Sequence, residues 1–354
     1  MSRVAPAVAA VRTAVRKALR DAAPSAAPPP PPSPAPAAAA GPLALVACSG
    51  GADSMALAEA AGFVGARLGW RVGLVTVDHG LQDGSRARAE SVAAWARRAG
   101  FAPVEVLPVT VSGRGGPEAA ARDARYRALT DAARRLGASA VLLGHTRDDQ
   151  AETVLLALAR GAGPRGLAGM PARRERDGVL WLRPLLSVRR DQTRAACAAL
   201  GLEYWEDPHN TDPAYARARV RTTALPALVA ALGDRVVDNL ARTAELVAAD
   251  DAALTRWAER VLADLPATDR ELPVAGLREL PAAVRTRVLH AWARSLGVPG
   301  AALSHRHVAA LDALVSDWHG QGPAYLPGGR VVRRRGDRLL AEPPRGGATA
   351  GGQV

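Results

Sequence analysis

Lysine is almost absent from this chain of 354 residues, because Lys17 is the only lysine among its 46 basic residues. A nucleotide-binding loop of the type Gly-x-x-x-x-Gly-Lys-Ser/Thr needs a lysine that reaches the β- and γ-phosphates. Lys17 precedes every glycine of the sequence, so it cannot belong to such a loop. If the chain binds a nucleotide, it therefore does so without a loop lysine.

Cysteine and long apolar runs are also scarce. Cys48 and Cys197 are the only cysteines, too few and too far apart for a disulfide framework, a zinc motif or an iron–sulfur motif. This composition favours a reducing, cytoplasmic location. No apolar run approaches the roughly 18 to 20 residues that a membrane-spanning helix needs. We therefore expect no membrane partner.

Positive charge, in contrast, is abundant: the formal net charge is +12 at pH 7, and nearly all the basic residues are arginines. Such a surface favours polyanions, with nucleic acid as the first candidate, and arginine makes bidentate contacts with phosphate. A generally basic, arginine-rich proteome is the alternative explanation. Charge alone does not decide between the two.

The order of predicted elements divides the chain into four parts. Residues 1–42 combine a helical pattern over 6–22 with an Ala/Pro-rich linker that cannot form a core, and we expect this part to be largely disordered. Residues 43–213 alternate strand and helix patterns, 214–320 form a helical domain, and 321–354 hold a short hairpin and a disordered tail. Within 43–213, strands are predicted at 43–48, 72–78, 103–108 and 140–144, helices at 54–68, 85–99, 118–136 and 149–160, and a further helix with a short strand at 188–205.

This alternation predicts an α/β domain with a doubly wound parallel sheet and helices on both faces. In such a sheet, ligands bind at the carboxyl ends of the strands. Three polar segments follow predicted strands, namely residues 49–54, Asp78 with His79, and Gly144 with His145. We expect these segments to converge on one edge of the sheet.

The segment after the first predicted strand has the composition of a phosphate-binding turn. Glycine lets the backbone approach a ligand and adopt positive φ, and the N–H groups of a helix N-terminus favour a phosphate. The segment predicts a pyrophosphate site in which Asp53 holds Mg²⁺, since Mg²⁺ takes oxygen ligands. The alternative is an ordinary strand-to-helix turn capped by Asp53. The residues of the turn are Ser49, Gly50, Gly51, Ala52, Asp53 and Ser54.

A second cluster follows the fourth predicted strand. His145, Asp149 and Glu152 are spaced by four and three residues, which places them on one helical face. No lysine or arginine is placed among these acceptors, so the cluster predicts recognition of a cationic ligand. The alternative, an acidic first turn that complements the helix dipole, explains Asp148 and Asp149 only.

The Ser-Gly-Gly-Ala-Asp-Ser segment is similar to the signature of the PP-loop pyrophosphatases, which split ATP between the α- and β-phosphates. Residues 77–85, 118–126 and 144–153 further resemble segments of the tRNA(Ile)-lysidine synthetases, and the likeness extends from 43 to about 226. It implies an adenine nucleotide alpha hydrolase-like fold, ATP as co-substrate and Mg²⁺. It also implies a two-step reaction: ATP adenylates the cytidine at the first anticodon position of an isoleucine tRNA with a CAU anticodon, and L-lysine then displaces AMP.

The resemblance also implies roles for individual residues. The turn residues, with Asp78 and His79, bind ATP, while Asp53 and Arg125 act in catalysis. His145, Asp149 and Glu152 bind free lysine. Because a carboxylate can bind an ammonium group and take its proton, our own hypothesis is that Asp149 is the base, with Glu152 and His145 orienting the ligand. Contacts to tRNA are expected from arginines whose alternative is a solvated surface: Arg122, Arg160, Arg165, Arg217, Arg219 and Arg221.

Two other functions stay open. A PP-loop enzyme of tRNA 2-thiolation relies on catalytic or cluster-binding cysteines, which Cys48 and Cys197 alone do not supply. A non-catalytic RNA-binding protein would have no need of Asp53, His145 and Asp149. The sequence leaves open whether the chain forms a homodimer.

Overall fold

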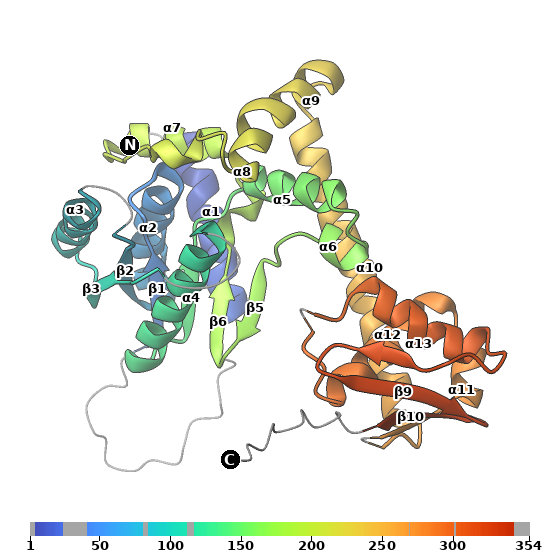
Figure 1. Cartoon of the computed structure of the whole chain (residues 1–354). Helices are drawn as coiled ribbons and strands as arrows, with labels where there is room; N and C mark the ends of the chain where they lie inside the picture. Colours follow the sequence, from blue (N-terminus) through green and yellow to red (C-terminus); the bar gives the residue numbers. More distant parts are fainter. Residues whose placement is uncertain are drawn as a thin grey trace, which may run out of the picture. The chain divides into compact units, whose positions relative to one another are not determined.

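The computed structural model describes residues 4–23, 41–80, 84–111, 117–268, 270–300 and 302–342. Most of the predicted linker at 23–42 and the predicted tail after 342 lie outside these ranges. The chain forms two compact units, Met1–Val247 and Ala248–Val354. The boundary falls inside the long helix α10 (Val236–Asp264), and Figure 1 shows the course of the chain through both units.

Unit 1 is built on a six-stranded sheet with the order β3-β2-β1-β4-β6-β5. Five strands run parallel, and only β5 is antiparallel to its neighbour β6. The four strands predicted from the sequence are confirmed, as is the α/β class. The strands are β1 (Leu43–Ala47), β2 (Arg71–Asp78), β3 (Val104–Pro108), β4 (Ala140–Leu143), β5 (Arg173–Arg176) and β6 (Val179–Leu182).

Helices cover both faces of this sheet. Successive side chains of β1 point to opposite faces and enter two different apolar clusters. Ala44 and Val46 belong to the cluster that includes side chains of α1, α2, α3 and α7, whereas Leu43 and Leu45 pack with α4. The predicted two-sided arrangement is therefore confirmed. These helices are α1 (Pro6–Ala22), α2 (Ala52–Gly65) with the short η1 (Ala66–Leu68), α3 (Ser85–Arg98), α4 (Pro117–Arg135) and α7 (Arg190–Leu200).

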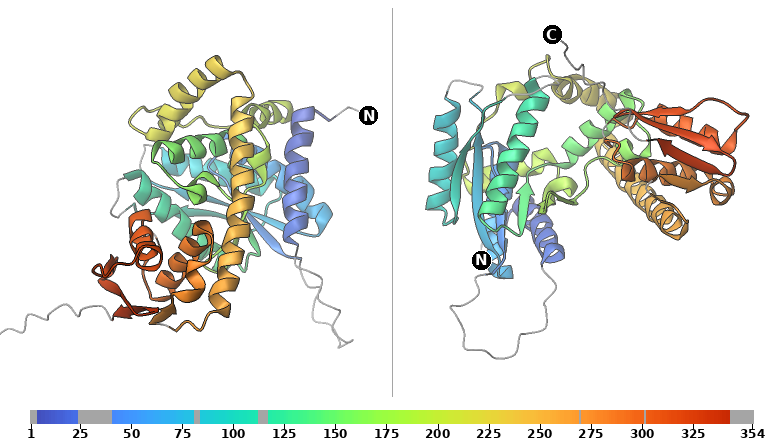
Figure 2. Two further views of the ribbon diagram at one scale, coloured as in Figure 1. Left: turned by 90° about the vertical axis from the view of Figure 1, so that its right-hand side faces the viewer. Right: turned by 60° about the horizontal axis from the view of Figure 1, so that its bottom comes forward.

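The N-terminal helix α1 belongs to this core. Val8, Val11, Val15 and Leu19 recur at helical spacing and are buried. They face α2 and α7, and Arg12 forms an ion pair with Glu59 of α2. Figure 2 shows α1 running alongside the sheet domain. The helix predicted over 6–22 is confirmed. The expectation that residues 1–42 are largely disordered is wrong for this helix, because its apolar stripe packs in the core of unit 1.

Two features of unit 1 differ from the sequence prediction. The hairpin of β5 and β6 was not predicted, because the side chains of β5 are four exposed charged residues without an apolar alternation. Its turn is made by Asp177 and Gly178, both with positive φ. The short strand expected before Trp205 is wrong: residues 202–207 have no regular secondary structure.

The segments that surround the carboxyl edge of the sheet are mostly helical. α5 (Arg147–Ala159) follows β4, and Thr146 closes its N-terminus in a capping box with Asp149. After α5 the chain passes through α6, the hairpin of β5 and β6, η2 and α7. It then continues through η3 into the helical run of α8, η4 and α9. The bounds are α6 (Pro164–Leu167), η2 (Pro184–Ser187), η3 (Pro208–Asn210), α8 (Ala216–Arg219), η4 (Val220–Ala224) and α9 (Leu225–Leu232).

The middle of that helical run, η4, is a π-helical turn. Pro226 explains it: in a continuous α-helix proline lacks the N–H that bonds the carbonyl four residues earlier, and its ring clashes with that carbonyl. The wider π turn accommodates the proline while Leu225 stays packed with Ala151 of α5 and Val237 of α10. Such turns occur often at functional sites.

Unit 2 holds a four-stranded antiparallel sheet, β7-β10-β9-β8, packed with helices around the buried Trp292. The predicted helices and the terminal hairpin are confirmed, whereas β7 is too short for its pattern to be recognised. No helix among the described residues is long and apolar enough to cross a membrane. The elements are β7 (Glu271–Pro273), α11 (Ala275–Arg278), α12 (Ala282–Ser295), α13 (His305–Ser316), β8 (Ala324–Leu326), β9 (Arg330–Arg335) and β10 (Arg338–Glu342).

Candidate active site

Three strand ends meet at one edge of the sheet in unit 1, as the sequence predicts. The 49–54 turn follows β1, His79 follows β2, and His145 follows β4. Together they line a cavity of about 330 Å³, to which Arg125 of α4 and Arg190 of α7 also contribute. The edge where an α/β sheet binds its ligands is therefore lined with polar groups.

The 49–54 turn is held in one shape by its own hydroxyl groups. Ser54 Oγ accepts a hydrogen bond from the Ser49 N–H at 3.2 Å and donates one to the Gly51 carbonyl at 2.9 Å. Gly50 has φ of 84°, which a side chain would strain. A side chain on Gly144 would lie 3.2 Å from backbone atoms of Asp53 and Ser54. The turn thus exposes backbone at the N-terminus of α2, the arrangement that binds phosphate.

Asp53 lies in the first turn of α2 and points to α7. Thr193 Oγ1 donates a short hydrogen bond to it, and Arg190 Nε lies 3.7 Å from its other oxygen. Burial raises the pKa of Asp53 to about 6. The described residues contain no cluster of three or more metal-binding side chains. A single carboxylate beside a pyrophosphate site still fits Mg²⁺, which binds through one or two carboxylates together with substrate phosphates.

Asp78 and His79, at the end of β2, have different surroundings. Asp78 Oδ1 accepts hydrogen bonds from Ser85 Oγ at 2.6 Å and from the Gly80 N–H at 3.1 Å, and the Ser85 bond lowers its pKa. Asp78 therefore stabilises the turn. His79 lines the cavity, and its buried Nδ1 has no hydrogen-bond partner among the described residues. Burial lowers the pKa of His79.

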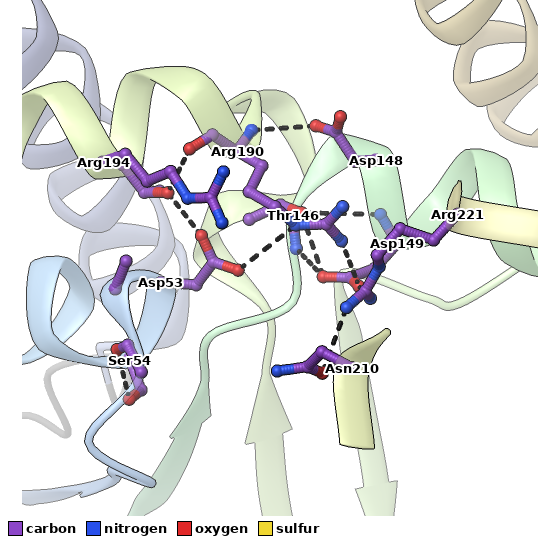
Figure 3. Close-up of polar contacts among 12 residues, drawn as sticks. Asp53, Ser54, Thr146, Asp148, Asp149, Arg190, Arg194, Asn210 and Arg221 are labelled. Carbon is purple, nitrogen blue, oxygen red and sulfur yellow. Dashed lines mark hydrogen bonds and ion pairs between the residues drawn. The ribbon is translucent and has the colours of Figure 1, made fainter. Parts of the chain in front are cut away.

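Arginines surround the acidic cluster, which corrects the expectation that none is placed among its acceptors. Arg190 Nη2 donates to Asp149 Oδ1 at 2.9 Å and to Glu152 Oε1 at 3.0 Å. Arg221 donates to both carboxylates, and Arg217 Nε lies 3.4 Å from Glu152 Oε2. Figure 3 shows Arg190 and Arg221 on either side of Asp149. These arginines are distant in sequence, so the local spacing could not reveal them.

This environment fixes the charge states of the cluster. Burial alone would raise the pKa of Asp149, but Arg190, first among the opposing groups, outweighs it, and the pKa falls to about 2. Burial lowers the pKa of His145 to about 3, so its imidazole is neutral at pH 7. Glu152 has no exposed surface at all. The cluster is therefore made of two carboxylates, paired arginines and a neutral histidine.

The arginines predicted to contact tRNA fall into two groups. Arg217 and Arg221 turn inward to α5, which corrects their prediction as a cationic edge, whereas Arg219 is exposed and donates to the carbonyls of residues 213 and 214. Arg160 and Arg165, on either side of the loop before α6, are exposed. Arg122 is exposed and lies over the Tyr126 ring.

Arg125 has the environment of an anion-binding residue. Its buried Nε has no hydrogen-bond partner, and no carboxylate lies within ion-pair distance of its guanidinium among the described residues. Burial lowers its pKa. A buried guanidinium without a counter-ion is costly. Because Arg125 lines the cavity, it is placed to receive an anionic ligand.

A second cavity of about 360 Å³ adjoins the first, and both are lined by His79, Arg125, His145, Asp149 and Arg221. It is further lined by Arg122, His209, Tyr215 and Arg217. The first cavity thus contains the 49–54 turn, and the second contains an arginine-rich wall. A molecule in the second cavity would lie next to one in the first.

Arg190 and Thr193, both in the first turn of α7, were not predicted as site residues. Their segment has an ordinary helical pattern, and nothing in its local sequence signals a site. Only the sheet order, which places β6 and the following helix beside β4, brings them to Asp53 and Asp149. Knowledge of strand adjacency is the signal that could have found them.

Comparison with known proteins defines the class. Residues 37–228 match the family model described as PP-loop domain, and residues 272–340 match the one described as TilS substrate binding domain. The fold also resembles the solved U34-tRNA thiolase NcsA from Methanococcus maripaludis with its [4Fe-4S] cluster, with a TM-score of 0.54 and 16% identity over 68% of this chain and 78% of that one. The catalytic unit is therefore a PP-loop ATP-binding domain.

Curated relatives identify the family within that class. The chain is 69% identical to the tRNA(Ile)-lysidine synthase of Salinispora tropica over 86% of this chain and 91% of that protein. It is 56% identical to the tRNA(Ile)-lysidine synthase of Streptomyces coelicolor over 84% of this chain and 85% of that protein. The chain belongs to the tRNA(Ile)-lysidine synthase family.

Proposed function

We propose that the protein joins L-lysine to C2 of the cytidine at the first anticodon position of CAU-bearing tRNA(Ile), with ATP converted to AMP and pyrophosphate. Family membership supports this activity, and one structural observation supports its location. The two adjoining cavities share Arg125, His145 and Asp149, so a nucleotide at the turn and two further substrates have a common meeting point. The reaction changes the codon read by the tRNA from AUG to AUA.

In the first step, the cavity beside the 49–54 turn holds ATP. The backbone of Gly50 and Gly51 and the hydroxyls of Ser49 and Ser54 face the pyrophosphate. Mg²⁺, when bound by Asp53 and phosphate oxygens, neutralises charge on the leaving group. Cytidine O2 attacks the α-phosphorus, the O–P bond to pyrophosphate breaks, and Arg125 stabilises the charge on the phosphoryl oxygens.

In the second step, lysine enters the neighbouring cavity beside His145 and Asp149. Its ε-amine attacks C2 of the adenylated base, and the electron pair of the C2–O bond leaves with AMP. Exposed arginines hold the tRNA backbone through phosphate contacts: Arg122 at the second cavity, and Arg160, Arg165 and Arg219 outside both cavities. Unit 2 contributes to substrate binding through residues 272–340, the segment that matches the TilS substrate binding domain.

Incorporation of labelled lysine into tRNA tests the proposal. The protein with ATP and Mg²⁺ should attach lysine to CAU-bearing tRNA(Ile) and release one pyrophosphate for each lysine. Asp53→Asn should lower this rate by at least about 100-fold, while Arg242→Gln, an exposed residue of α10, serves as the matched control. Tight tRNA binding without lysine incorporation would favour an RNA-binding protein, and incorporation of sulfur would favour thiolation.

A further inference from the structure

Every acceptor position of Asp149 is occupied within the protein. Its Oδ2 accepts hydrogen bonds from the Thr146 N–H at 2.8 Å and the Thr146 hydroxyl at 2.9 Å. Its Oδ1 accepts from Arg190 Nη2 at 2.9 Å and from Arg221 Nη2 at 3.2 Å. An ionised carboxylate offers about four acceptor positions. Asp149 therefore has none left for an ammonium group.

Glu152 is occupied in the same way and is completely buried. Its Oε1 accepts from Arg190 Nη2 at 3.0 Å and Arg221 Nε at 2.8 Å, and its Oε2 accepts from Arg221 Nη2 at 3.0 Å. Arg217 Nε lies within ion-pair distance of Oε2, at 3.4 Å, without donating a hydrogen bond to it. The two carboxylates of α5 thus hold three guanidinium groups in place.

The carboxylates of this cluster are already paired with arginines. Three guanidinium groups face Asp149 and Glu152, and Arg190 also lies 3.7 Å from Asp53 Oδ2. Asp148 accepts a hydrogen bond from the backbone N–H of Arg190. An ammonium group would have to displace an arginine or lie beside three guanidinium groups.

We infer that the arginine cluster of Arg190, Arg217 and Arg221 selects the neutral form of the lysine ε-amine, with Asp149 and Glu152 positioning the arginines instead of removing the proton. The inference rests on the proposed function. The ammonium proton is released to solvent before the amine enters. During attack the C2–N bond forms, the C2–O bond breaks with its electron pair leaving on AMP, and one amine proton is released.

Groups on the other elements around the cavity support the same choice. Arg122 and Arg125 of α4 add positive charge, and His79 and His145 have lowered pKa values and are neutral at pH 7. Asp207 and His209 lie on the η3 side of the cavity. Asp207 is the one further carboxylate among these lining residues, and it lies close enough to His79 to act on its pKa.

The pH dependence of the lysine step tests the inference. With saturating ATP and tRNA, kcat/KM for lysine should rise about tenfold per pH unit if the neutral amine is the form that binds, because free lysine loses its proton with a pKa near 10.4. It should stay constant if the ammonium binds and a carboxylate of the site takes its proton. If only the neutral amine binds, KM should fall about tenfold per pH unit between pH 6.5 and 8.5 while kcat stays constant. A constant KM with kcat rising tenfold per unit would overturn the inference, because the ammonium would then bind first.

Arg217→Gln gives a second readout, since it removes one of the three guanidinium groups without touching Asp149. In this variant the pH dependence should move from KM into kcat, whereas Arg242→Gln should behave as the wild type. An unchanged KM profile in Arg217→Gln would also contradict the inference. Release of pyrophosphate is measured in parallel. If no lysine is incorporated at any pH, the proposed function itself is contradicted. If lysine is incorporated but its KM does not depend on pH, only the role of the arginines is contradicted.

Discussion

Arg190 connects Asp53 with Asp149, two carboxylates that follow different strands of the sheet. Its Nη2 lies 2.9 Å from Asp149 Oδ1, and its Nε lies 3.7 Å from Asp53 Oδ2. Its backbone N–H donates to Asp148 Oδ2 at 2.8 Å. Figure 3 shows the side chain between the two carboxylates. The first turn of α7 therefore sets the distance between the proposed pyrophosphate site and the acidic helix α5.

Substitution of Arg190 should destabilise the fold as well as the site. In Arg190→Gln, Asp149 and Glu152 lose a buried partner while Arg221 remains, so we expect the free energy of unfolding at pH 7 to fall by about 3 kcal/mol. Urea unfolding measures this change. Arg189→Gln is the matched control, because Arg189 pairs with the more exposed Asp238 and should cost under about 1 kcal/mol. Equal losses in both variants would contradict the role of Arg190.

Gly144 should be intolerant of even one methyl group. A Cβ there would lie 3.2 Å from the backbone of Asp53 and Ser54, and the phosphate-binding turn would have to shift by a few tenths of an ångström. Because small displacements of reacting groups are costly, Gly144→Ala should slow tRNA-dependent pyrophosphate release by about tenfold. Gly322→Ala, where the added Cβ meets open space, is the control. The prediction fails if the two variants release pyrophosphate equally fast.

His145 should make the protein less stable as the pH falls below neutrality. Its pKa is lowered from the ordinary value of 6.5, so the unfolded chain takes up the proton first. The free energy of unfolding should then decrease between pH 6.5 and 4.5 by up to about 1.4 kcal/mol per pH unit. Unfolding of His145→Gln across this range should show a shallower slope, whereas the exposed His305→Gln should keep it. A slope unchanged by His145→Gln would refute the prediction.

The exposed arginines near α6 should act on tRNA binding alone. Each phosphate contact contributes about 0.7 to 0.9 to the slope of log affinity against log salt concentration. Arg160→Gln and Arg165→Gln should each lower that slope by about this amount and weaken tRNA binding, with no change in ATP affinity. Titrations at several salt concentrations provide the measurement, with Arg98→Gln on the exposed end of α3 as control. Unaltered slopes would place the tRNA elsewhere.

The sequence predicted the parts of the site that are local. The turn at 49–54, His79 and His145 each follow a strand whose apolar pattern is short and continuous, and parallel strands bring their ends together. Side chains that come from elsewhere in the chain were misjudged. Arg217 and Arg221 show helical spacing typical of a solvated face, and only tertiary packing turns them toward α5. The acidic cluster consequently looked unpaired, although Arg190, Arg217 and Arg221 pair with it.

The same limit applies to the fold. Strands β1, β2 and β4 are buried on both sides, so their residues are apolar enough to be recognised. β5 is held by its hairpin with β6 alone and has four charged residues, and β7 spans three residues. The helix α1 showed its period clearly, but its partners α2 and α7 could not be read from it. The apolar pattern of a helix or strand indicates which of its side chains must be buried. Only the fold shows which other elements bury them.

The π turn at 220–224 gives this segment one residue more than a regular helix needs to cover the same arc. An α-helix rotates by about 100° per residue, so one fewer residue in regular helix turns the chain about as far as the π turn does. With α9 anchored through Leu225, loss of one residue that restores regular helix would therefore leave Arg217 on the side of Glu152. The same loss would return Pro226 to a regular helix, where its ring clashes with an earlier carbonyl. When relatives are aligned, a gap of one residue within these five positions is thus compatible with an intact arginine cluster, provided that the proline is lost as well.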